Sequence, residues 1–92
     1  MKTVYKFDLA LTDEQTILLH QSAEILHVAP QDCRSTLCLW VLVDTADVSL
    51  RLRRIFIHGT GHDVGDASKR YIGTFQLDNG RLVFHVFDGG WE

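Results

Sequence analysis

Apolar and polar residues alternate along much of this chain with the two-residue period of a β-strand. In the opening segment, residues 3–9, Tyr5, Phe7 and Leu9 share one face and charged residues occupy the other. Such alternation is typical of a strand with one buried face. The chain therefore begins with a predicted half-buried strand.

A second alternating segment lies in the middle of the chain and carries arginines. Ile55 and Ile57 face one way. The opposite face carries Arg54, Phe56 and His58. The pattern predicts a strand over Arg51–His58 with these two faces.

One run, Leu37–Val43, is apolar on both faces. This is typical of a central strand covered on both sides, and it predicts that Trp40 and Cys38 lie in the core. The β-branched residues in the run argue against a buried helix. Glu24–Val28 is another short apolar stretch, and Pro30 ends it because proline cannot donate to a strand ladder.

The segment after the first strand is open to two interpretations. Thr12–Gln15 resembles a capping box that would start a short helix. The following residues, Thr16–Leu19, fit a short strand equally well.

The last third of the chain predicts a β-hairpin. Tyr71–Leu77 and Leu82–Phe87 flank Asp78–Arg81, in which Asn79-Gly80 suits a two-residue type I′ turn. Six or seven short strands with closely spaced loops predict an all-β fold: a single small antiparallel sandwich or partly open barrel with at most one short helix. The length predicts one domain, residues 1–92.

Composition narrows the functional classes. Hydrophobic residues make up 46% and charged residues 23%, which indicates a globular chain. The net charge of −3 is far from that of a general nucleic-acid binder and too mild for a DNA mimic. No secretion signal opens the sequence, and no apolar run is long enough to span a membrane, so a cytoplasmic location is expected. Cys33 and Cys38 are then expected to be reduced, with a disulfide across a tight hairpin as the alternative.

Several segments, taken in order, resemble a family of short phage and prophage proteins that carry a domain of unknown function. The resemblance covers nearly the whole chain, and its most specific parts are Gly59-Thr60-Gly61-His62 and Tyr71-Ile72-Gly73-Thr74-Phe75. It implies a viral or prophage accessory protein and implies no activity. The chain departs from the family pattern in its arginine cluster around Arg53 and in its Gly89-Gly90-Trp91 tail.

The loop Gly59–Lys69 and the arginine cluster suggest an anion site. Glycines beside a threonine let backbone N–H groups approach an anion. Arginines bind phosphates, and arginines and aromatic residues stack on bases. The loop lacks Walker A spacing, and a structural loop or a solvated strand face explains the same residues. The predicted ligand-binding residues are Arg51, Arg53, Arg54, Phe56, His58, Thr60, His62, Lys69 and Arg70, and Trp91 is a predicted interface residue unless it folds back.

No residue cluster has the spacing of a catalytic or metal signature. His58, His62, Asp63 and Asp66 are candidate metal ligands, but no second His or Cys pair accompanies them. Neither cysteine sits in a nucleophile motif. We therefore expect no enzymatic activity, no cofactor and no metal, and we expect His85 to be an ordinary sheet residue.

Three functions from different classes fit these features. The first is a phage accessory protein that counters host defence by sequestering a small phosphorylated, nucleotide-derived ligand. The second is an inhibitor that binds a host defence complex such as a CRISPR effector, and the third is a virion or regulatory component. A homo-oligomer is expected in each case, because a small core with exposed strand edges gains from pairing.

Overall fold

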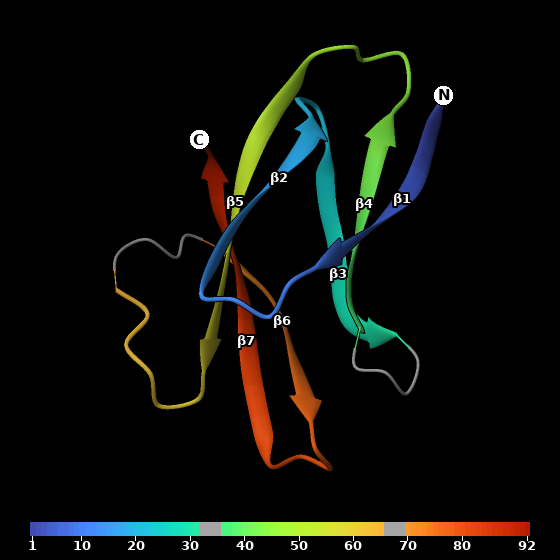
Figure 1. Ribbon diagram of the computed structural model, residues 1–92. Coiled ribbons are helices and arrows are strands. Elements are labelled where there is room, and N and C mark those ends of the chain that lie inside the picture. Colours follow the sequence, from blue (N-terminus) through green and yellow to red (C-terminus); the bar gives the residue numbers. More distant parts are fainter. Residues whose placement is uncertain (32–35, 66–69) are drawn as a thin grey trace.

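The computed structural model describes residues 1–31, 36–65 and 70–92 (Figure 1). These described residues form seven β-strands and no helix. The strands are β1 (Lys2–Leu9), β2 (Glu14–His20), β3 (Glu24–Gln31), β4 (Thr36–Asp44), β5 (Leu50–Gly59), β6 (Arg70–Leu77) and β7 (Leu82–Trp91).

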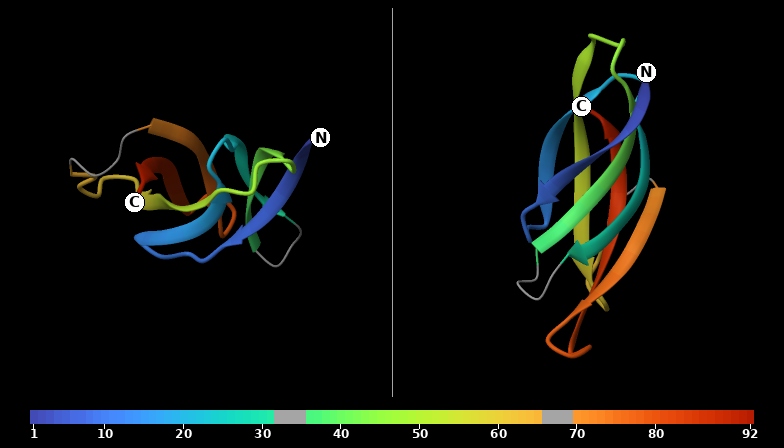
Figure 2. Two further views of the ribbon diagram at one scale, coloured as in Figure 1. Left: turned by 90° about the horizontal axis from the view of Figure 1, so that it is seen from above. Right: turned by 90° about the vertical axis from the view of Figure 1, so that its right-hand side faces the viewer.

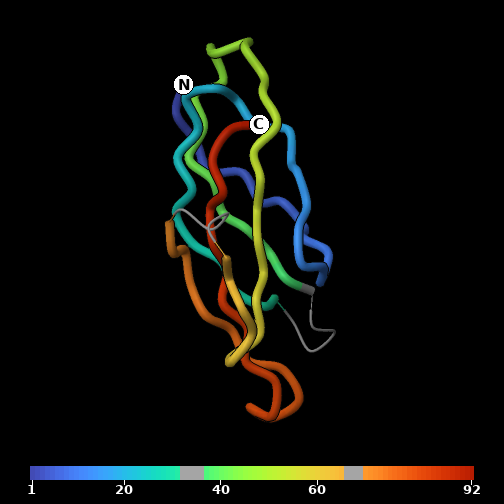
Figure 3. Tube along the Cα trace, turned by 90° about the vertical axis from the view of Figure 1, so that its left-hand side faces the viewer, coloured from blue at the N-terminus to red at the C-terminus, as the bar shows by residue number. Residues whose placement is uncertain are grey.

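The strands are arranged in two antiparallel sheets that face each other. One sheet has three strands in the order β1-β4-β3, and the other has four in the order β2-β5-β7-β6. Figure 2 shows the two sheets side by side when the molecule is seen from above. The molecule is elongated, about 42 × 32 × 16 Å, with both termini toward one end and the β6–β7 hairpin at the other (Figure 3). The predicted all-β sandwich is confirmed, and the sheets do not close into a barrel.

The core lies between the sheets and is built from alternate residues of the strands. Leu39 and Val41 of β4 face Ile55 and Ile57 of β5, as the strand alternation predicts. The buried cluster as a whole comprises Leu9, Leu19, Val28, Leu37, Leu39, Val41, Val43, Ile55, Ile57, Phe75 and Val86.

One side of the sandwich is closed by contact between the edge strands β3 and β6. Gly73 of β6 makes this contact close, since a Cβ atom there would lie 2.8 Å from Cγ1 of Val28. Val28 is almost fully buried, with an exposed fraction of 1%. The absence of a side chain at Gly73 therefore lets the two sheets approach at this edge.

The open choice at the second segment is settled in favour of a strand. Gln15 does not act in a helix cap: its Nε2 donates to the Ala10 carbonyl at 2.6 Å, and its Oε1 accepts from the Ala10 N–H at 3.0 Å. The Thr12 hydroxyl donates to the Glu14 carbonyl. These bonds fasten the turn between β1 and β2, and the ladder with β5 holds the rest of β2 extended.

The prediction that β4 is covered on both sides was wrong. The register places Trp40 opposite Lys6 and His27, on the face of the sheet that looks away from the core. Trp40 is only partly buried and packs near the His27 ring, with centroids 6.0 Å apart. Cys38 is fully buried but shares this outer face, where its Sγ lies 3.5 Å from Oδ1 of Asp8. Strand alternation turns Trp40 outward although its type suggested the core, whereas Cys38 is buried as predicted.

The β6–β7 hairpin has the predicted turn at its centre. Asn79 (φ 54°) and Gly80 (φ 85°) are both left-handed, and the Arg81 N–H donates to the Asp78 carbonyl at 3.1 Å. Asp78 is also left-handed, with φ 53°, so the connection is longer than a minimal two-residue loop. The ladder resumes at the pair Leu77 and Leu82.

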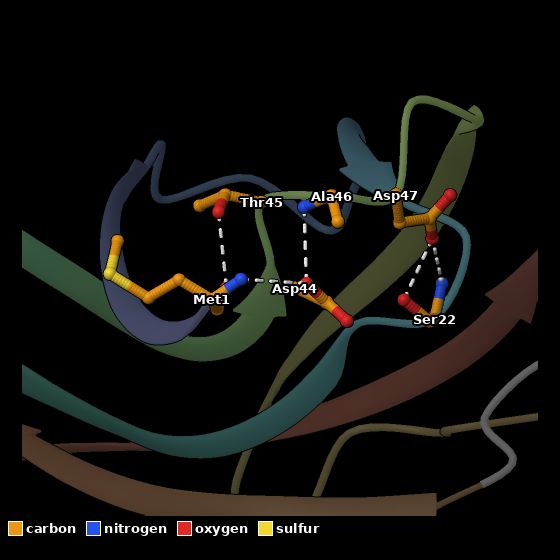
Figure 4. Close-up of polar contacts among 6 residues, drawn as sticks. All are labelled: Met1, Ser22, Asp44, Thr45, Ala46 and Asp47. Carbon is orange, nitrogen blue, oxygen red and sulfur yellow. Dashed lines mark hydrogen bonds and ion pairs between the residues drawn. The ribbon is translucent and has the colours of Figure 1, made fainter.

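Hydrogen bonds fasten the loops at the end of the sandwich that carries the N-terminus (Figure 4). Oδ1 of Asp44 accepts from the Ala46 N–H at 3.0 Å and lies 3.3 Å from the Met1 ammonium group. Oδ2 of Asp47 accepts from both the hydroxyl (2.7 Å) and the N–H (2.9 Å) of Ser22. The Ala46 N–H, with help from the ammonium group, lowers the pKa of Asp44, and the Ser22 hydroxyl and nearby N–H groups lower the pKa of Asp47.

Candidate functional site

A hollow of about 280 Å³ lies between the start of the β5–β6 connection and the β6–β7 hairpin. A smaller hollow of about 70 Å³ adjoins it and shares Gly59, His62 and Phe84. The larger hollow is lined by Gly59, Thr60, His62, Arg81, Leu82, Val83 and Phe84. Its volume is at the lower end of the range found for small-molecule sites.

The Gly-Thr-Gly-His segment shapes one wall of this hollow. The His62 N–H donates to the Gly59 carbonyl at 3.0 Å, and Gly61 between them has a φ of +86°. The His62 ring lies against Gly59, because a Cβ at that glycine would be 2.9 Å from the ring carbon Cε1. The first glycine thus makes room for the imidazole, and the second supplies the left-handed backbone of the turn.

The opposite wall comes from the hairpin, which is fixed to the same segment. The Thr60 N–H donates to the Val83 carbonyl at 3.1 Å. The Thr60 hydroxyl lies 2.8 Å from Nε2 of His85, whose Nδ1 lies 3.0 Å from the Thr74 hydroxyl. Both ring nitrogens of His85 are therefore occupied, which confirms its interpretation as a sheet residue and leaves Thr60 held at the mouth of the hollow.

The larger hollow combines two basic side chains with an apolar floor. Within the described part of the chain, the side chains of His62 and Arg81 form no hydrogen bond or ion pair. Among the described residues, no carboxylate lines this hollow, although Asp13 lines the smaller one. Phe84 and its neighbours supply apolar surface. The arrangement suits an anion that carries an apolar or aromatic part.

Two of the predicted arginines are engaged with Trp91 instead. Register places Arg51 and Arg53 on the core-facing side of β5, opposite Leu19 and Ile17. Their guanidinium carbons lie 5.4 Å and 4.3 Å from the centre of the Trp91 ring. Trp91 packs against the core cluster, so it folds back onto its own chain. The cation–π contacts hold this C-terminal residue in place.

Arg53 also forms an internal ion pair with Asp88. Its Nε donates to Oδ1 at 2.7 Å and its Nη2 to Oδ2, which is a bidentate arrangement. The exposed fraction of Asp88 is only 4%, and the Gly90 N–H donates to its Oδ1 at 2.8 Å. Burial acts to raise the pKa of Asp88, but the bonds from Arg53 and Gly90 outweigh it and hold this pKa below its ordinary value. Arg53 is thus already neutralised within the fold.

We expect stability to fall in acid because of this carboxylate. A pKa that is lower in the folded than in the unfolded state stabilises the fold fully above the ordinary value, about 3.9, and progressively less as the pH falls below it. Thermal melts between about pH 6 and pH 2 test this. The Asp88→Asn variant is expected to lose less stability over that range, with a residual loss from Asp44 and Asp47, whose pKa values are also lowered. Equal acid sensitivity in Asp88→Asn and the unmodified chain would contradict the assignment.

Arg54 lies on the other face of β5. Its guanidinium carbon is 6.0 Å from the Phe56 ring centre, and its Nη2 donates to the Gly89 carbonyl at 3.4 Å. Phe56 stacks with His58 at a centroid distance of 6.2 Å. Alternation along β5 therefore separates Arg54 from the arginines beside Trp91, so the three arginines do not share one face of this strand.

The remaining predicted residues are divided between the hollow and other places. Thr60 and His62 line the hollow. Arg70 lines a smaller space of about 120 Å³ that also holds Asp88, whose charge disfavours an anion there. Lys69 lies outside the described residues. Sequence reasoning missed Arg81, although its place directly after the Asn79-Gly80 turn was the signal that it projects from a hairpin end.

The candidate metal ligands and the possible disulfide lie partly outside the described residues. Of the metal-ligand candidates, Asp66 lies outside the described residues, and the described ones include no group of three side chains arranged to hold a metal ion. Cys33, half of the alternative disulfide, is also outside them. In the described ranges, no helix is long and apolar enough to cross a membrane.

Comparison with known proteins identifies the family. A family model described as a domain of unknown function, DUF7352, matches residues 1–91. No curated protein and no solved structure matches the chain. The match confirms the resemblance to an uncharacterised family. The chain belongs to the DUF7352 family.

Proposed function

We propose that this chain is a non-enzymatic binding protein that holds a small phosphorylated, nucleotide-derived ligand in the hollow between the Gly59–His62 turn and the β6–β7 hairpin. The observation that carries the proposal is the pair His62 and Arg81, which line this space without an acidic partner in the described chain. A phosphate accepts hydrogen bonds from both types of side chain.

The rest of the hollow fits the other part of such a ligand. Phe84, Leu82 and Val83 offer apolar surface for a base or sugar, and the Thr60 hydroxyl adds a polar contact. A preformed, mostly apolar hollow with a few fixed polar groups is the usual form of a small-molecule site. The proposed site does not include Arg53, which the sequence had suggested as a ligand-binding residue, because the charge of Asp88 neutralises it.

The biological role that we propose follows from the resemblance to phage and prophage proteins. A binding protein that does not transform its ligand affects a nucleotide signal by lowering the free concentration of that signal. Sequestration of a defence signal is therefore the role that suits a phage accessory protein with this site.

Calorimetry with defined probes tests the site. Cyclic dinucleotides, nucleoside monophosphates and inorganic phosphate are titrated into the full chain. We expect at least one nucleotide to bind, and Arg81→Ala and His62→Ala each to weaken it about tenfold or more, since a charge-assisted hydrogen bond contributes about 1.5–3 kcal/mol. Lys6→Ala, which removes an exposed cation on the other sheet, serves as the matched control.

Two results would overturn the proposal. One is the absence of binding by every probe in a chain shown to be folded. The other is binding that Arg81→Ala and His62→Ala leave unchanged. Either result would favour the second function instead, that of an inhibitor that binds a host defence protein.

A further inference from the structure

The two sheets have four edge strands, and three of them carry features that discourage pairing with another chain. β3 has a bulge at Leu26 and contains Pro30, and β6 has a bulge at Ile72. These two edges also contact each other. β1 carries the charged side chains of Lys2 and Lys6. Bulges, proline, lysine and coverage are the usual protections of a sheet edge.

Within the described ranges, β2 has no proline, lysine or bulge, and it pairs only with β5. Its seven residues, Glu14–His20, include no proline, lysine or arginine, and its ladder with β5 runs without a register shift. Leu18 projects from the outer face with an exposed fraction of 54%, directly opposite Leu52, which is 43% exposed. A regular edge strand that lacks these protections and exposes a leucine is suited to pairing with another strand.

The backbone groups that point away from β5 can be identified from the ladder. The Gln21 N–H donates to the Ser49 carbonyl, so odd-numbered positions near β2 exchange hydrogen bonds with β5. In an antiparallel ladder the intervening residues direct their N–H and C=O groups to the other side. Thr16 and Leu18 therefore present their backbone groups on the free edge.

The carbonyl groups at both ends of this edge are already bonded within the chain. The Thr12 hydroxyl donates to the Glu14 carbonyl at 3.2 Å, and the Ala23 N–H donates to the His20 carbonyl at 2.9 Å. The open acceptors are thus confined to the centre of β2, between these two ends.

We propose that β2 is a dimer interface, in which two copies of this chain pair their β2 strands antiparallel about Ile17. In this register Thr16 of one copy lies opposite the partner subunit's Leu18, so both residues exchange N–H···O=C bonds. The two sheets then join into one continuous sheet across the dimer. The Leu18 side chain of each copy then lies beside Thr16 of the partner subunit.

Self-complementarity argues for a second copy as the occupant. The same register sets Glu14 opposite the partner subunit's His20 at each end of the interface. A carboxylate and an imidazole form a favourable cross-strand pair, and the two-fold symmetry makes that pair twice. No other register that pairs the free edges overlaps the full length of β2, because the strand is centred on Ile17.

Analytical ultracentrifugation of the full chain tests the interface. We expect the unmodified chain to be a dimer and Leu18→Lys to raise the dimer dissociation constant about tenfold or more, with an unchanged circular dichroism spectrum. The matched control is Val4→Lys, which places the same charge on the other free edge, at a residue 48% exposed. It is expected to leave the dimer intact.

A charge exchange tests the register. Glu14→Lys is expected to weaken the dimer because it removes an attractive pair at each end, and the combination of Glu14→Lys with His20→Glu is expected to restore it. A monomeric unmodified chain overturns the proposal, whatever other protein the chain captures. A dimer that Leu18→Lys does not weaken, or that Val4→Lys weakens equally, overturns it as well.

Discussion

The Asp88→Ala substitution is expected to destabilise the fold by about 3–5 kcal/mol, the largest effect of any substitution considered for this chain. The change leaves the Arg53 guanidinium without its bidentate partner in a site where the exposed fraction of that side chain is 14%. An unpaired charge in such a site costs much more than the pair contributes. The substitution also removes the carboxylate that accepts a hydrogen bond from the Gly90 N–H. That hydrogen bond helps to position the neighbouring Trp91.

Chemical denaturation measures this loss. The matched control is Glu24→Ala, which removes an exposed carboxylate and is expected to change stability by less than about 0.5 kcal/mol. Replacing both partners, Arg53→Met with Asp88→Leu, is expected to recover much of the loss, because no charge is then left unpaired. A loss below about 1 kcal/mol in Asp88→Ala would show that water reaches Arg53 and that the pair is not an internal one.

The Gly89→Ala substitution is expected to destabilise the fold by about 1–3 kcal/mol through overpacking. A Cβ at this position would lie 2.2 Å from Cε2 and 2.8 Å from Cδ2 of Phe56, and 3.1 Å from Cβ of Arg54. Phe56 is buried, with an exposed fraction of 6%, so its ring has little freedom to move aside. For a domain of this size the expected fall in Tm is about 4–8 °C for each kcal/mol.

A double-mutant cycle separates overpacking from backbone effects. The cost of Gly89→Ala is expected to shrink in a Phe56→Leu background, because the smaller side chain removes the clash. Gly90→Ala is the neighbouring comparison: nothing lies within 4 Å of a Cβ there, but its φ of +87° disfavours a side chain. The cost of that change is expected to be independent of Phe56. Equal costs of Gly89→Ala in both backgrounds would refute the contact as the cause.

The strands themselves were largely predictable from the sequence. The alternation of Phe7 and Leu9, and of Ile55 and Ile57, set apart two faces that the fold buries, since alternation is a local property of an extended chain. Tyr5, on the same face as Phe7, is 42% exposed. The hairpin followed from Asn79-Gly80 for the same reason. The position of Trp40 was predicted wrongly from the sequence. Its residue type favoured burial in the core, but the strand register places it on the outer face of the sheet.

The candidate site was only partly predictable. The Gly-Thr-Gly-His segment marked Thr60 and His62, whose local turn chemistry can be recognised in sequence. Arg81 is distant from them along the chain and joins them only because the Thr60 N–H is bonded to Val83 beside the hairpin. The arginine cluster was predicted to bind a ligand as a group, but residues that are neighbours in sequence point to opposite faces of a strand, so Arg54 is separated from Arg51 and Arg53.

Strand positions, the core-facing residues of the alternating strands and the hairpin turn thus come from interactions between residues close together in the sequence. The strand order, the internal pairing of Arg53 with Asp88 across 35 residues, and the unprotected edge at β2 come only from packing of the folded chain. Local preferences act over a few residues, whereas these features depend on which distant segments meet. A two-residue period shows that a face is buried, but it does not show which strand covers it.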